Sequence, residues 1–143
     1  MAINSVYLPT RSGGSLLLTA SCNELSYDVA TNTSRVACSI QIQNPNNYTL
    51  YSGYSQPYIK MTVHTTSETP GWASWDVGTK YIPNTPAHFD DSIYIEYNVP
   101  HKADGSLACS VTASFYANGA SASYIPSDGY INSGTVYCTN IPR

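Results

Sequence analysis

The segment HKADG, residues 101–105, places a histidine, a lysine and an aspartate within one short stretch. A histidine near a carboxylate can belong to a catalytic relay or a metal site, so His101 and Asp104 raise the question of an enzyme. No serine, cysteine or second base stands in fixed register with them. Pro100 cannot donate to a β-ladder, and Asp104-Gly105 supplies the positive φ of a turn. We predict a hairpin connection, with Asp104 accepting hydrogen bonds from turn amides and His101 in solvent at a strand end.

The remaining acidic residues give an enzyme little support. A glycosidase needs two carboxylates about 5 to 9.5 Å apart across a cleft, whereas the nine acidic residues of this chain fall mostly at turns. Asp90 and Asp91 adjoin a proline-rich loop, where a calcium-binding turn is the alternative to a plain solvated one. We predict no enzyme, no catalytic residue, no metal site and no cofactor.

Cys22, Cys38, Cys109 and Cys138 lie far apart and form no CxxC pair, so the usual zinc and thioredoxin spacings are missing. Each cysteine is in phase with apolar residues on a candidate strand, which favours buried thiols that act as small hydrophobic side chains. One or two disulfides are the alternative, and three connectivities are possible if both form.

The elements that must position these residues are strands. The chain has nine glycines, nine prolines and thirteen tyrosines in 143 residues, and no apolar segment with helical spacing exceeds two turns. Alternation of apolar and polar residues, bounded by turn formers, predicts strands at 16–22, 24–30, 35–43, 57–65, 92–99, 106–115 and 133–138. We therefore predict that residues 1–143 form a single domain, an all-β antiparallel immunoglobulin-like β-sandwich of about seven to nine strands.

Charge excludes some classes of partner. Charged residues make up 10% of the chain, where about 25% is usual. The six basic residues are scattered singly and the net charge is −3, so we expect neither nucleic acid nor membrane as a partner. The first residues, MAINSVYLPTRSGG, do not have the pattern of a signal peptide. A surface of Ser, Thr, Asn and Tyr suits contact with sugars or with neighbouring protein subunits.

Two aromatic stretches are candidates for binding carbohydrate. Sugar rings stack on flat aromatic side chains, while amides and carboxylates form hydrogen bonds with the sugar hydroxyls. The candidates are Trp72, Trp75, Tyr48, Tyr51, Tyr54, Tyr58, Asn46 and Asn47. The alternative is packing: at least one tryptophan is expected to fill the sandwich core, and the tyrosines to bury their rings with the hydroxyls wet. Trp72, beside Pro70-Gly71, is the better candidate for exposure.

Three segments carry a resemblance to a known family. LSYDVATNTSRVACSIQIQ (25–43), VPHKADGSLACSVTASF (99–115) and SGTVYCTNIPR (133–143) follow one another along nearly the whole chain. In this order they resemble a repeated module of the tail fibre and minor structural proteins of long-tailed bacteriophages, especially those of Gram-positive hosts. The four cysteines and the dense tyrosines of residues 46–58 depart from that pattern, which puts the surface specificity in doubt.

The resemblance implies a virion component with an immunoglobulin-like sandwich, assembled in the cytoplasm of a host bacterium and then exposed in the phage tail. A reducing site of assembly favours free thiols. The first function we expect is a non-enzymatic structural module, a spacer or assembly domain in host attachment that contacts other tail subunits or copies of itself. The alternative is a module that binds cell-wall polysaccharide through exposed Tyr and Trp loops.

Overall fold

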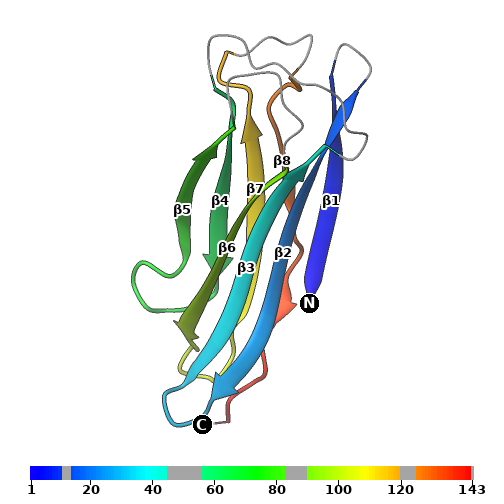
Figure 1. Cartoon of the computed structure of the whole chain (residues 1–143). Coiled ribbons are helices and arrows are strands. Elements are labelled where there is room, and N and C mark those ends of the chain that lie inside the picture. The colour runs from blue at the N-terminus through cyan, green and yellow to red at the C-terminus, as the bar shows by residue number, and fades with distance from the viewer. Residues whose placement is uncertain (11–13, 45–55, 83–89, 120–124, 143) are drawn as a thin grey trace.

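The strands of the chain form two layers. The computed structural model describes residues 1–10, 14–44, 56–82, 90–119 and 125–142. These residues contain no helix and form nine strands: β1 (Ala2–Pro9), β2 (Ser15–Asp28), β3 (Thr33–Gln43), β4 (Tyr58–Thr65), β5 (Ser74–Tyr81), β6 (Asp90–Pro100), β7 (Ala108–Tyr116), β8 (Gly129–Asn132) and β9 (Val136–Tyr137). One sheet has the order β1-β2-β3-β6 and the other β5-β4-β7-β8, with β9 also paired to β7 (Figure 1). All pairs are antiparallel, which confirms the predicted β-sandwich.

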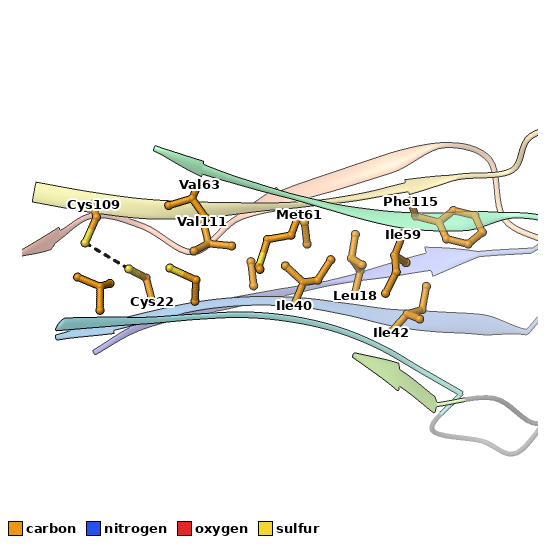
Figure 2. Close-up of a cluster of buried hydrophobic side chains, with 14 of the residues drawn as sticks. Leu18, Cys22, Ile40, Ile42, Ile59, Met61, Val63, Cys109, Val111 and Phe115 are labelled. Atoms are coloured by element: carbon orange, nitrogen blue, oxygen red, sulfur yellow. Dashed lines mark hydrogen bonds between the residues drawn. The ribbon is translucent and has the colours of Figure 1, made fainter. Parts of the chain in front are cut away.

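The core lies between the two sheets and follows the alternation of the sequence. On β4, Ile59, Met61 and Val63 point inward and are at most 1% exposed. Leu18 and Ile40 face them from the other sheet (Figure 2). Because side chains alternate between the faces of a strand, each such run buries one face and leaves the other to solvent. The predicted inward faces of 35–43, 57–65 and 106–115 are confirmed.

The ends and edges of the sheets differ from the prediction. The two short strands expected at 16–22 and 24–30 are one long strand, β2, which continues past an irregularity in its pairing between Glu24 and Ser26. β1, β5 and β8 were not predicted from the sequence. They are outer strands that bury few side chains, so their apolar periodicity is weak.

The HKADG segment is not a hairpin. It joins β6 in one sheet to β7 in the other, because β6 pairs with β3 and β7 pairs with β4. The turn itself is as predicted: Gly105 has a φ of 89°, and Asp104 Oδ1 accepts a hydrogen bond from the Ser106 amide at 2.9 Å. A Cβ on Gly105 would collide with the carbonyl oxygen of Ile141, so the close approach of the C-terminal segment requires glycine.

Candidate functional site

The prediction that His101 sits in solvent is wrong. Its side chain is buried, with 5% of the residue exposed, because the corner between the sheets folds under the C-terminal segment. Nδ1 donates to the Gly105 carbonyl oxygen at 2.7 Å, and Nε2 lies 2.6 Å from Ser34 Oγ. Both ring nitrogens are therefore engaged within the protein. His101 fixes the corner and is not placed to act on a substrate.

Sequence reasoning missed the polar network around His101. Ser34 Oγ donates to Glu24 Oε2 at 2.9 Å, and the same carboxylate accepts hydrogen bonds from the Thr139 amide at 2.9 Å and hydroxyl at 2.7 Å. Burial acts to raise the pKa of Glu24, but hydrogen bonds from Thr139, Ser34 and Cys138 outweigh it and the pKa is lowered. The network ties β2 and β3 to the C-terminal segment. No local motif in the sequence marks it, because its members are far apart along the chain.

The two tryptophans lie together in an aromatic cluster with Tyr97 of β6. The ring centroids are 4.9 Å apart for Trp72–Trp75, 5.3 Å for Trp75–Tyr97 and 5.8 Å for Trp72–Tyr97, all in edge-to-face arrangement. All three side chains are half-buried and pack against the core. Neither tryptophan is part of the buried core, as was expected of at least one of them, but both pack against it, and Trp72 is not a freely exposed ring.

Of the predicted tyrosine and asparagine candidates, the structure places Tyr58. Its ring stacks on Tyr116 at a centroid distance of 4.8 Å and contacts Tyr81 at 5.4 Å. Tyr58 is half-buried, in agreement with packing at the outer face of a sheet. The other candidates, Tyr48, Tyr51, Tyr54, Asn46 and Asn47, lie outside the described residues.

A polar hollow with an exposed aromatic ring lies beside the β2–β3 hairpin, and sequence reasoning did not identify it. It has a volume of about 320 Å³, and its lining includes Tyr27, Asp28, Arg35 and Asn98. Tyr27 is 53% exposed. The volume falls at the small end of ligand sites, which span roughly 300 to 1,000 Å³. An aromatic ring beside a carboxylate, a guanidinium and an amide is a combination that can stack on a sugar ring and bind its hydroxyls.

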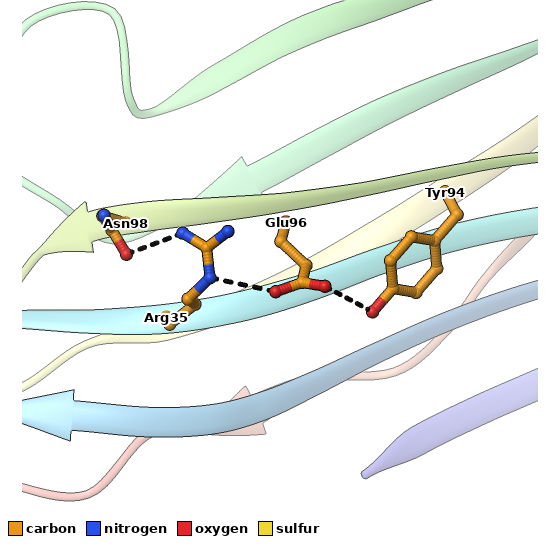
Figure 3. Close-up of polar contacts among 4 residues, drawn as sticks. All are labelled: Arg35, Tyr94, Glu96 and Asn98. Atoms are coloured by element: carbon orange, nitrogen blue, oxygen red, sulfur yellow. Dashed lines mark hydrogen bonds and ion pairs between the residues drawn. The ribbon is translucent and has the colours of Figure 1, made fainter.

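Hydrogen bonds hold the polar side of this hollow in place. Arg35 donates from Nε to Glu96 Oε1 at 2.9 Å and from Nη1 to Asn98 Oδ1 at 3.0 Å, and the Tyr94 hydroxyl donates to Glu96 Oε2 at 3.1 Å (Figure 3). Hydrogen bonds from Arg35 and Tyr94 lower the pKa of Glu96, and the bond to Glu96 raises the pKa of Tyr94. The guanidinium is thus oriented along the outer face of β3 and β6, although its side chain is still 42% exposed.

The edges of the sandwich differ in how they are protected. β1 pairs with β2 in unbroken register over all eight residues, and no other strand among the described residues pairs with it. It contains no charged residue, and Ile3 and Tyr7 are 57% and 61% exposed. The opposite edge of the sheet, β6, contains Asp90, Asp91 and Glu96. β5, the edge of the other sheet, carries an aspartate and a lysine and pairs irregularly with β4. β1 is therefore the least protected of these three edges.

The acidic pair Asp90-Asp91 is engaged by neighbouring side chains. Asp91 forms an ion pair with Lys80 of β5 at 3.3 Å, and Asp90 accepts a hydrogen bond from Gln41 at 3.0 Å. Within the described ranges, no group of three or more His, Cys, Asp or Glu side chains is arranged to hold a metal ion. Searched over the same ranges, the chain contains no helix long and apolar enough to cross a membrane.

Comparison of the sequence with models of known protein families gave no match, and comparison with curated proteins gave no match either.

Proposed function

We propose that this chain is a non-enzymatic structural module of a phage tail or tail fibre, which acts as a spacer or assembly domain in host attachment. The resemblance of three ordered segments to phage tail modules suggests the setting. The observation that carries the assembly role is the unprotected edge strand β1. Its partner in this proposal is a neighbouring tail subunit or a second copy of the chain.

Edge strands of monomeric proteins are usually blocked, because their free N–H and C=O groups pair readily with another chain. Charges, short length and irregular pairing are the common blocks, and β6 and β5 carry them. β1 has none of these blocks before Pro9, and the exposed Ile3 and Tyr7 add apolar contact area. A strand from a neighbour that adds to β1 would extend the four-stranded sheet and cover this area.

Two experiments test this proposal: one measures self-association of the chain, and the other asks whether the chain is present on phage tails. Size-exclusion light scattering of the purified chain over a range of concentrations should show reversible self-association. Ile3→Lys should weaken it by about tenfold or more, since an unpaired buried charge costs well over 1.4 kcal/mol. Tyr130→Lys is the matched control, because Tyr130 is 75% exposed on β8 of the other sheet. Gold-labelled antibodies against the chain should decorate the tails of phage particles. Particles without label, together with a chain that stays monomeric, would contradict the proposal.

The hollow beside the β2–β3 hairpin favours a second function, recognition of cell-wall polysaccharide. This site differs from the Tyr and Trp loops expected from the sequence, since Trp72, Trp75 and Tyr58 are occupied by packing. Tyr27 supplies an exposed ring, and Arg35 is held by Glu96 with its side chain 42% exposed. A preorganised guanidinium loses less side-chain entropy when a ligand binds.

Binding to a panel of isolated bacterial cell-wall polysaccharides tests this second function. Saturable binding that free saccharide competes away should fall by about tenfold or more in Tyr27→Ala and in Arg35→Ala, as expected when a stacking or hydrogen-bonding group of about 1.4 kcal/mol is lost. Tyr7→Ala is the control, because Tyr7 is similarly exposed on the same sheet but does not line the hollow. Equal binding by all four proteins, or none by any, would reject the site.

A further inference from the structure

The four cysteines, far apart in the sequence, meet in the core near the end of the sandwich where the HKADG corner lies. All four are free and buried, so the prediction of buried thiols is confirmed. Cys22 Sγ of β2 lies 3.5 Å from Cys109 Sγ of β7, across the space between the two sheets (Figure 2). Cys138 Sγ lies 3.9 Å from Cys109 Sγ. Cys38 stands directly opposite Cys22 in the β2–β3 pairing and interacts with its thiol.

Geometry distinguishes the possible disulfides. A disulfide needs Cβ atoms about 3.5 to 4.5 Å apart, whereas directly opposed residues on antiparallel strands have Cβ atoms about 4.5 to 5.5 Å apart. This disfavours Cys22–Cys38. Cys22 and Cys109 point at each other from facing sheets, and their sulfur atoms are 3.5 Å apart, against 3.9 Å for Cys109 and Cys138.

We propose that Cys22 and Cys109 form an oxidation site, at which peroxide converts the two thiols into a disulfide that joins the two sheets. The Cys22 thiolate attacks one oxygen of hydrogen peroxide, which breaks the O–O bond and gives a sulfenic acid and hydroxide. The Cys109 sulfur then attacks the Cys22 sulfur, the S–O bond breaks, and the departing hydroxide takes the Cys109 proton. Together with the proton first released by Cys22, the balance is two thiols and one peroxide giving one disulfide and two waters.

The surroundings of the pair supply both reactivity and access. Hydrogen bonding with Cys109 and Cys38 lowers the pKa of Cys22, whereas the interactions of Cys109 with Cys138 and Cys22, and its burial, raise the pKa of Cys109. Cys22 is thus the thiol favoured as the thiolate nucleophile. Cys109, but not Cys22, lines a surface hollow of about 130 Å³, which has room for a small molecule. Peroxide would therefore reach Cys22 from the Cys109 side, where the two Sγ atoms are 3.5 Å apart.

Peptide mapping of the oxidised protein tests the connectivity. The reduced, folded chain is treated with stoichiometric hydrogen peroxide, remaining thiols are blocked with N-ethylmaleimide in denaturant, and the digest is analysed by mass spectrometry without reduction. Trypsin cleaves after Arg35 and so separates Cys22 from Cys38, and chymotrypsin cleaves after Phe115 and Tyr116 and so separates Cys109 from Cys138. The expected product is one dominant Cys22–Cys109 link, with the other two thiols blocked by the reagent.

Two variants and a melting curve complete the test. Cys109→Ala should prevent the disulfide, whereas Ile42→Val, a control at a buried core position away from the thiols (Figure 2), should still form the Cys22–Cys109 link. The bond closes a loop between residues 87 apart, so oxidation should raise the Tm of the wild-type chain by about 5 °C or more. A dominant Cys109–Cys138 or Cys22–Cys38 link, or thiols that remain free after peroxide, would overturn the proposal. The peptide map of the oxidised wild-type chain tests the proposal even if Cys109→Ala fails to fold.

Discussion

At the scale of single residues, the polar chemistry of this chain is used mainly to hold the end of the sandwich together. Glu24, Ser34 and His101 are brought together by hydrogen bonds between strands and corner that are distant in sequence. A catalytic pair would present its groups to a substrate, whereas here His101 and its partner Ser34 are both buried. The side chain of His101 therefore stabilises the corner between the sheets.

Glu24→Gln should lower the free energy of unfolding by about 1–3 kcal/mol at pH 7, because the carboxylate accepts hydrogen bonds from Thr139 and Ser34. The folded-state pKa of Glu24 is lowered, so its contribution is present above the unfolded-state pKa of about 4.3 and is lost as the pH falls through the folded value. Urea unfolding at pH 7 and pH 3 should show the gap between wild type and variant narrowing. Glu68→Gln, at an exposed loop position, should change little; an equal gap at both pH values would contradict the prediction.

At the scale of elements, the sequence predicts the inner strands well and the outer ones poorly. β3, β4 and β7 bury one complete face, so their apolar residues alternate strongly and the predicted ranges lie close to the observed ones. β1 and β5 bury few side chains and leave a weak pattern. The predicted hairpin after β6 was wrong because a turn motif indicates that the chain reverses direction but not which sheet contains the next strand.

The hollow beside the β2–β3 hairpin also could not be predicted from the sequence. Tyr27 lies at the end of β2 and Asn98 near the end of β6, and they become neighbours only because β3 pairs with both strands. The sequence indicates which residue types are able to bind a sugar, but not which of them meet. It also could not show that Trp72 and Trp75 pack on Tyr97, since that depends on the placement of β5 beside β6.

At the scale of the whole molecule, side chains close the open sides of the sandwich where no backbone ladder joins the sheets. On one side, Lys80 of β5 pairs with Asp91 of β6, and the cluster of Trp72, Trp75 and Tyr97 covers the core. On the other side, Asn4 of β1 donates to the carbonyl oxygen of Asn132 in β8. An exposed ion pair contributes little, so the aromatic cluster is the main closure of the β5–β6 side.

Trp75→Ala should therefore lower the free energy of unfolding by about 2–3 kcal/mol, somewhat less than the loss expected for a fully buried tryptophan because the ring is half-buried. Urea denaturation followed by circular dichroism measures the change. Tyr130→Ala is the control, because Tyr130 is 75% exposed and should shift the midpoint only slightly. If Trp75 instead bound a ligand, Trp75→Ala would leave stability unchanged and would reduce binding to cell-wall polysaccharide. This result would support a binding role for the tryptophans. If Trp75 instead closes the side of the sandwich, Trp75→Ala should be less stable than wild type. Under conditions in which the variant is folded, it should bind polysaccharide as wild type does.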